Sequence, residues 1–276
     1  MITKEELQYA SKSSISVPYP GDEYAYDTIN RLSYALMMFK KRYEDKRIHL
    51  LLNNGEGLSF EIRSKNLAHL FGIDYRDLTT NPVMKPLLSS VLGFGEKEVI
   101  NSYALISRII ENADKVIEHD ENNFHKILNY YKVMVKTTCF IRMSAFDKFN
   151  FGVINFDKRT YEKTVGKSFY PNASKYLLLP MDEELVQFCM LGLVYDKYSG
   201  MMVPETFMTP TIFHRYLIRQ EFLLPGEIVI DGNNEFKHAV ASREDKKQLL
   251  NLYKSIILTY KTNSTINEVG KYRRSK

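Results

Sequence analysis

The spacing of apolar residues changes near the middle of the chain, and this change constrains the fold more than any other feature. In the first half, apolar side chains recur every three or four residues, as at Ile29, Leu32 and Leu36, which is typical of helices with one buried face. In the second half they fall in short, often alternating runs separated by turn residues, which is typical of an antiparallel sheet. The sequence therefore predicts an α+β protein, with a small antiparallel β-sheet, packed helices and a helical insertion.

Local patterns place the expected elements along the chain. Helices are expected over residues 24–43, 66–73, 96–117 and 122–135, and strands over 140–143, 151–156, 175–179, 186–195, 201–207 and 227–230. The runs 47–52 and 58–62 flank an Asn- and Gly-rich turn, which predicts a β-hairpin. Gly72 is expected to end the short helix at 66–73. Ser242, with Asp245 three residues later, predicts the capped start of a last helix that runs to about residue 260.

The expected domain organisation is simple. One α+β globular domain covers residues 24–262 and contains the helical insertion at about 74–137. Residues 1–23 form a polar arm that ends in two prolines, which oppose helix formation. Residues 263–276 form a basic tail.

Composition excludes several classes of protein. The chain is 44% hydrophobic and 26% charged with a formal net charge of +5, which is ordinary for a soluble globular domain. It has no apolar run near the roughly 20 residues of a membrane span, and no signal-peptide pattern at its start. Cys139 and Cys189 are the only cysteines, too few for a disulfide framework. We therefore expect a cytoplasmic protein with no membrane partner, whose mild positive charge permits nucleic-acid binding.

Known catalytic motifs are missing from the sequence. It contains no Walker loop, dinucleotide-binding glycine fingerprint, zincin His-Glu-x-x-His or nucleophile elbow. The six histidines are scattered without the spacing of metal ligands. We therefore expect neither a metal site nor a cofactor.

Asn66 and His69 form the first candidate site. They lie three residues apart on a short predicted helix that follows directly after a strand, so they share one helical face. An imidazole titrates near neutral pH and suits His69 to proton transfer. The structural alternative is a histidine that only bonds a neighbouring carbonyl.

Three further segments carry candidate residues. Lys175 opens a strand, with Lys167 in the loop before it, and a lysine there stabilises phosphate charge or is simply solvated. Pro204 inside a strand indicates an edge or a bulge, and a bulge would re-aim Glu205 and Thr206 toward a site. The last segment offers groups for phosphate contact and base stacking, or an inert surface; its candidates are Tyr216, Arg219 and Gln220.

In this order, the segments resemble a phage-associated branch of the barnase/EndoU/colicin/RelE-like nuclease superfamily. The residues that carry the resemblance are the strand and helix ending in 66–73, the strands 175–179 and 191–196, the block 203–207 and the segment 216–220. The similar region covers roughly residues 48–222, and the helical insertion is not part of the minimal nuclease fold.

The resemblance implies helices on a small antiparallel sheet and metal-independent RNA cleavage, used in conflict between phages and hosts. In such enzymes the 2′-OH of RNA attacks the adjacent phosphate. His69 would then be the general base or acid, Lys175 and Arg219 would stabilise the phosphate, and Thr206 would position it. The substrate-binding set would be Asn66, Lys167, Glu205, Tyr216 and Gln220.

Two other functions remain open from the sequence. Helical HEPN-type ribonucleases use an Arg and a His four to six residues apart, and Arg63 and His69 have that spacing. A non-catalytic antiphage or phage-encoded module that binds a protein, as a sensor or an inhibitor, is the other, since the 19 Tyr and 16 Phe residues suit a protein interface. The expected partners are accordingly RNA, such as tRNA or mRNA, or a phage or antitoxin protein.

Overall fold

A computed structural model of the chain describes residues 23–143, 149, 151–165, 172–182, 187–208, 219–232, 235–251 and 253–254. The labelled helices are α2 (Glu23–Arg42), the 3₁₀ helix η1 (Ser64–Asn66), α3 (Leu67–Leu70), α4 (Tyr75–Thr80), α5 (Leu87–Ser90), α6 (Ser102–Glu111), α7 (Ala113–Asn122), α8 (Tyr130–Met143) and α9 (Lys158–Val165). The strands are β1 (Arg47–Leu52), β2 (Gly57–Glu61), β3 (Gly152–Asn155), β4 (Lys175–Asp182), β5 (Gln187–Asp196), β6 (Met201–Met208), β7 (Glu221–Leu223), β8 (Pro225–Gly232) and β9 (Glu235–Val240). The predicted arm and basic tail lie outside these residues, apart from Glu23.

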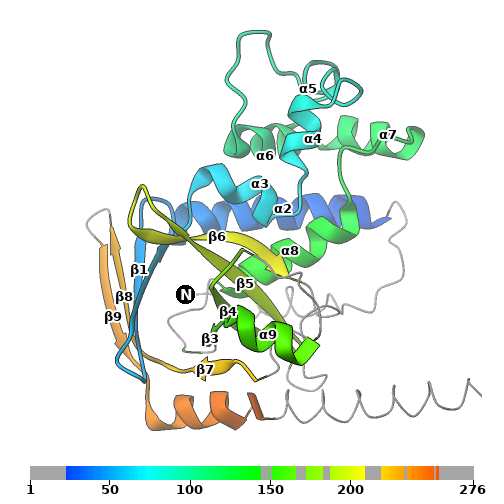
Figure 1. The fold of residues 1–276 in the computed structure, drawn as a ribbon. Helices are drawn as coiled ribbons and strands as arrows, with labels where there is room; N and C mark the ends of the chain where they lie inside the picture. Colours follow the sequence, from blue (N-terminus) through cyan, green and yellow to red (C-terminus); the bar gives the residue numbers. More distant parts are fainter. Residues whose placement is uncertain are drawn as a thin grey trace, which may run out of the picture.

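Within the described residues, nine strands form one curled sheet in the order β7-β3-β4-β5-β6-β2-β1-β8-β9 (Figure 1). All neighbours are antiparallel except β2 and β6, which are parallel where Phe60 pairs with Met202. The predicted α+β class is confirmed, but the predicted small sheet is wrong. The parallel β2–β6 contact joins the early hairpin to the late strands, and no local sequence pattern signals such a long-range contact.

The helices lie mostly to one side of this sheet. In Figure 1, α2, α3 and α8 lie over β6, and α4 to α7 extend beyond them. Phe140 of α8 connects the layers: its ring packs edge-on against Phe71 at 4.9 Å, Tyr43 at 5.5 Å and Phe207 of β6 at 6.4 Å between centroids. Aromatic rings in this geometry fix one helix–sheet arrangement more strongly than aliphatic contacts do.

Several predicted elements are confirmed, with shifts at their ends. α2 and the β1–β2 hairpin occupy the predicted ranges, and Gly55 in the hairpin turn has a φ of +84°. The predicted capping box forms in both directions: Ser242 N–H donates to Asp245 Oδ2 at 2.8 Å, and Asp245 N–H donates to Ser242 Oγ at 3.1 Å. The helix that follows is described as far as residue 254.

The helical middle departs from the prediction in three places. Residues 140–143, predicted as a strand, form the last turn of α8. All α8 residues from 133 to 141 are buried, and a short apolar run of this kind cannot be told from a buried strand by its spacing. The helix predicted over 96–117 starts only at Ser102, where Asn101 Oδ1 accepts the Ala104 N–H at 2.8 Å, and it breaks at Asn112. The helix predicted from 122 starts only at Tyr130. In the loop before it, the backbone N–H groups of Ile127 and Leu128 donate to the Asp120 carboxylate instead of to helical carbonyl groups.

Candidate active site

His69 lies on α3, a single turn of helix between η1 and α4. Leu67, Ala68 and Leu70 are buried, and the Ala68 N–H donates to Ser102 Oγ of α6 at 2.6 Å. Since three of the four α3 residues face the core, His69 is left on the exposed side. Gly72, with a φ of +84°, ends the turn and donates its N–H to the His69 carbonyl at 3.1 Å.

A β-bulge brings Glu205 to the same corner. Along β5, Gly192 pairs with Thr206 while Leu193 pairs with Pro204, so Glu205 is the extra residue of β6. The bulge predicted from Pro204 is therefore confirmed, although β6 lies inside the sheet and not at its edge. A bulge redirects side chains from the regular alternation, and the Glu205 charge acts on His69, where it raises the pKa of the imidazole.

Two asparagines hold the bulge in place. Asn66 Nδ2 donates to the carbonyl oxygen of Pro204 at 2.8 Å, which ties the start of α3 to β6. Asn172 Nδ2 donates to Glu205 Oε1 at 3.3 Å. The amide of one predicted substrate-binding residue, Asn66, thus positions the backbone beside another, Glu205.

Helix α8 adds two lysines beneath His69. Lys132 and Lys136 are four residues apart and share one face of the helix. Lys136 is only 7% exposed, and its Nζ donates to the carbonyl oxygen of His69 at 3.4 Å. Burial, and then the charge of Lys132, lower the pKa of Lys136 from 10.5 to about 8. Both lysines lie close enough to lower the pKa of His69.

The electrostatics of His69 favour its neutral form. Desolvation is the largest cause that lowers its pKa, followed by Lys136 and Lys132, while Glu205 and Asp74 oppose the change. Although the residue is exposed overall, the side of it that faces α8 and β6 loses hydration. At neutral pH, therefore, the site combines a neutral imidazole, which can accept a proton, with a carboxylate and two lysines.

The other predicted site residues are not brought to His69 by any contact among the described residues. Lys175 forms an ion pair with Glu56 in the β1–β2 turn. Gln220 is buried, and its amide accepts the Asp157 N–H at 2.6 Å and donates to the Asp157 carbonyl at 3.2 Å. Gln220 thereby fixes the start of α9.

For Arg219 the structure gives the exposure and the backbone conformation, and for Thr206 it gives the backbone pairing. Arg219 is exposed in the turn before β7 with a φ of +57°, and the backbone of Thr206 lies opposite Gly192. Lys167 and Tyr216 lie outside the described residues. The structure thus brings together Asn66, His69 and Glu205 from the predicted set.

The HEPN-type alternative gains no support from the fold. Arg63 follows strand β2, and its guanidinium is engaged in ion pairs with Glu61 and Asp196. A nine-stranded sheet is also not the helical bundle that this class of ribonuclease uses.

Sequence reasoning missed Lys132 and Lys136. A signal was present, because both lysines interrupt an otherwise apolar helical segment at a four-residue spacing. A charge on the buried face of a helix is costly unless it has a partner or a function.

The described residues contain no group of three or more His, Cys, Asp or Glu side chains arranged to hold a metal ion. Among the same residues, no helix has both the length and the apolar character needed to cross a bilayer. Comparisons of the chain with protein-family models, with curated proteins and with solved structures found no match.

Proposed function

We propose that this protein is a metal-independent endoribonuclease that cleaves RNA through attack of a 2′-OH on the adjacent phosphate. The observation that supports it most is the attachment of α3 to β6 and α8 by the Asn66–Pro204 and Lys136–His69 hydrogen bonds. Glu205, Lys132 and Lys136 thereby lie within electrostatic reach of His69. This set combines a proton acceptor, a carboxylate that favours the protonated imidazole, and cations for a phosphate. RNA cleavage by this route needs these groups and no metal ion.

Each group has a role in the proposed reaction. The neutral imidazole of His69 removes the 2′-OH proton, the 2′ oxygen bonds to phosphorus, and the bond from phosphorus to the 5′ oxygen breaks. The ammonium of Lys132, which is less buried than Lys136, gives a proton to the departing 5′ oxygen. The products are a 2′,3′-cyclic phosphate and a 5′-OH end.

Two residues support this exchange of protons. Glu205 stabilises the imidazolium that forms on His69, as the carboxylate of a catalytic triad does. The buried ammonium of Lys136, whose pKa is about 8, stabilises through its charge the phosphorane that forms. A cytoplasmic tRNA or mRNA is the substrate class that we propose, in an enzyme used in phage–host conflict or as a toxin.

The proposal is tested with the purified full-length protein and total cellular RNA in EDTA. Wild type is expected to cleave, and His69→Ala is expected to lose activity by at least 100-fold while it remains folded, since a general base contributes about 10²–10⁴ in rate. Equal cleavage by both proteins, or none by folded wild type, would reject the assignment.

One observation favours a second function, binding of a phage or antitoxin protein without catalysis. Phe124, between α7 and α8, is 94% exposed, and aromatic residues are enriched in protein interfaces. Under this alternative, Phe124→Ala abolishes the biological effect and His69→Ala leaves it intact. The nuclease predicts the reverse.

A further inference from the structure

The turn between β5 and β6 is tied to the segment that leads into α3. Arg63, between β2 and η1, forms ion pairs with Glu61 and with Asp196 at the end of β5. Asp196 also accepts the Tyr198 N–H at 3.1 Å and the Ser199 hydroxyl at 3.2 Å. Arg63 lowers the pKa of the Asp196 carboxyl, so Asp196 stays ionised at neutral pH and keeps its ion pair with Arg63.

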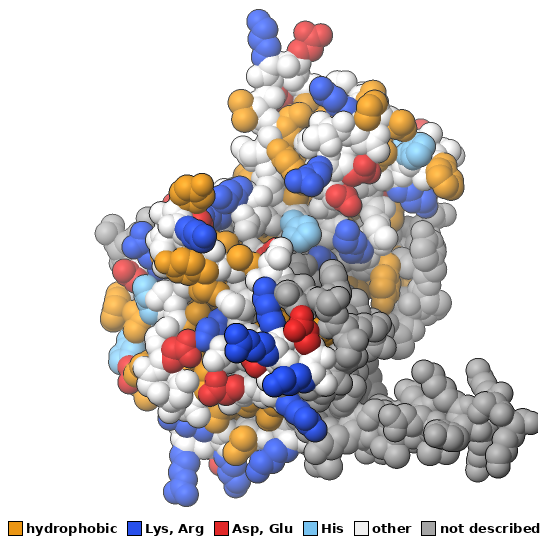
Figure 2. Space-filling view, viewed as in Figure 1, with side chains coloured by type: hydrophobic (Ala, Val, Ile, Leu, Met, Phe, Trp, Pro, Cys, Tyr) orange, Lys and Arg blue, Asp and Glu red, His pale blue; other side chains and the backbone are white. Residues whose placement is uncertain are grey.

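Aromatic and basic side chains alternate on this corner. Tyr195 is 56% exposed and Tyr198 is fully exposed, with the exposed Lys197 between them in sequence. Lys65 is exposed on the adjacent segment. Figure 2 shows hydrophobic and basic side chains next to one another at the upper left, over these strand ends. Exposed tyrosine rings beside cations are the usual platform on which unpaired bases stack.

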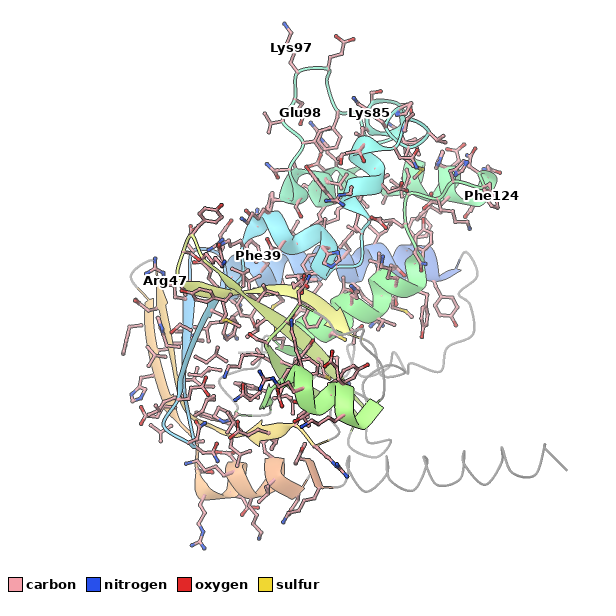
Figure 3. All side chains as sticks on the ribbon, viewed as in Figure 1. Phe39, Arg47, Lys85, Lys97, Glu98 and Phe124 are labelled. Atoms are coloured by element: carbon pink, nitrogen blue, oxygen red, sulfur yellow. The ribbon has the colours of Figure 1, made fainter. Side chains whose placement is uncertain are left out.

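A pocket of about 420 Å³ opens next to this platform. Its apolar lining includes Phe39, at the end of α2 (Figure 3), and Ile62. Its charged lining residues are Lys46, Arg63, Lys65, Glu44, Asp45 and Glu61. Since cations and carboxylates occur there in equal number, the pocket has no excess of positive charge with which to bind a phosphate group. It suits a flat, uncharged ligand whose edges carry both donors and acceptors, as a nucleobase does.

We propose that this pocket and the two tyrosines bind unpaired bases of single-stranded RNA next to the cleavage site. The inference rests on the proposed function and names its substrate class. Ser64 at the pocket and His69 are five residues apart along η1 and α3, a rise of roughly 9 Å. That length lies within a single-strand site of about four nucleotides.

The test measures binding without cleavage. The probe is a labelled eight-nucleotide single strand with 2′-O-methyl groups, which cannot attack its own phosphates, and the readout is its fluorescence anisotropy. Tyr198→Ala is expected to weaken binding about fivefold or more, because one base–aromatic stack contributes that much. Tyr198→Phe keeps the ring and is expected to bind as wild type does. Ser64→Trp, at the pocket wall, is expected to weaken binding by filling the pocket.

The matched control is Phe124→Ala, which removes another exposed ring far from Phe39 (Figure 3). It is expected to leave RNA binding unchanged, and a blunt RNA duplex is expected to bind wild type and Tyr198→Ala equally. Equal single-strand affinity of wild type and Tyr198→Ala would overturn the inference, as would an equal loss in Phe124→Ala.

The outcomes separate this inference from the proposed function. If Tyr198→Ala loses binding and wild type does not cleave RNA, the single-strand site stands and the nuclease fails. If cleavage depends on His69 but Tyr198→Ala and Ser64→Trp bind the single strand as wild type does, the nuclease proposal stands and the single-strand site fails.

Discussion

The side-chain amide of Asn66 donates a hydrogen bond to the carbonyl oxygen of Pro204 at 2.8 Å, across 138 positions of the chain. Asn66 immediately precedes α3, which carries His69, and Pro204 immediately precedes the bulged residue Glu205. This bond therefore ties the helix that carries the imidazole to the strand that carries the carboxylate. In the proposed mechanism it is a positioning contact.

Asn66→Asp tests this contact, since it keeps the size of the side chain and removes the donor. We expect a loss of about 1 kcal/mol in the free energy of unfolding and a fall in kcat that exceeds any change in KM. Urea denaturation and steady-state cleavage measure the two effects. Asn81→Asp, at an exposed bond to Asp77 in the insertion, is the control. If the two variants have the same kcat, Asn66 does not position the site.

Lys136 is expected to lower the stability of the fold while it supports cleavage. A pKa lowered from 10.5 to about 8 corresponds to a cost on the order of 3 kcal/mol for keeping the ammonium charged in the folded protein. Lys136→Met fills the same space without charge, so we expect a higher free energy of unfolding at pH 7 and little remaining cleavage. Lys132→Met, at a less buried position, is expected to change stability less. A destabilised but active Lys136→Met would contradict the assigned role.

The same lysine gives stability a defined dependence on pH. Below about pH 8 the ammonium is charged in both the folded and the unfolded protein, and its full cost is present. Between about 8 and 10.5 the folded protein releases the proton while the unfolded chain keeps it, so the contribution of this group to stability rises with pH. We expect urea midpoints of wild type and Lys136→Met to converge across this range. A constant difference would show that the pKa is not lowered.

Cleavage is expected to follow a bell-shaped pH profile. The rate rises as His69 loses its proton, at a pKa below its ordinary 6.5, and falls above about 8 as Lys136 loses its own. Glu205→Gln removes a charge that raises the pKa of His69, so the acid limb should move to lower pH while the maximal rate falls. An acid limb that does not move would separate Glu205 from His69.

Gly72 is expected to tolerate no side chain. Its φ is +84°, and an added Cβ would lie 3.0 Å from the Lys132 carbonyl oxygen of α8. Gly55 has the same φ but has no atom within 4 Å of such a Cβ, so Gly55→Ala measures backbone strain alone, about 1 kcal/mol. We expect Gly72→Ala to cost at least about 2 kcal/mol and to lower activity by moving α3. Equal losses of stability would show that the contact with α8 has no effect.

The sequence predicts the features of this fold that depend on neighbouring residues. The hairpin turn, the helix end at Gly72, the bulge at Pro204 and the Ser242–Asp245 cap each follow from residues a few positions apart, and all are present. The β2–β6 pairing depends on a contact between distant residues, and the loop at 123–129 depends on a side chain seven to eight residues away. In the loop, Asp120 accepts the Ile127 N–H at 2.6 Å and the Leu128 N–H at 3.0 Å, and no helical periodicity reveals that competition.

Some residues of the candidate site can likewise be recognised from their neighbours in sequence, and others only from the folded chain. Asn66 and His69 are recognisable because they lie on one turn of helix, and Glu205 because proline disturbs a strand. Lys175 and Gln220 are polar residues near strand starts, but their side chains bind Glu56 and Asp157, partners that only the folded chain brings near. The four-residue spacing of Lys132 and Lys136 is visible in the sequence, but only the packing of α8 against α3 places Lys136 next to His69.

The most direct measurement is the chemistry of the cut ends. A single-stranded RNA is incubated with wild type in EDTA, beside the same strand with one 2′-deoxy substitution at the mapped cleavage position. We predict 2′,3′-cyclic phosphate and 5′-OH ends from the first strand, and no cut at the substituted position of the second. Cleavage that continues at the deoxy position, or ends that carry a 5′-phosphate, would contradict 2′-OH attack and with it the role given to His69.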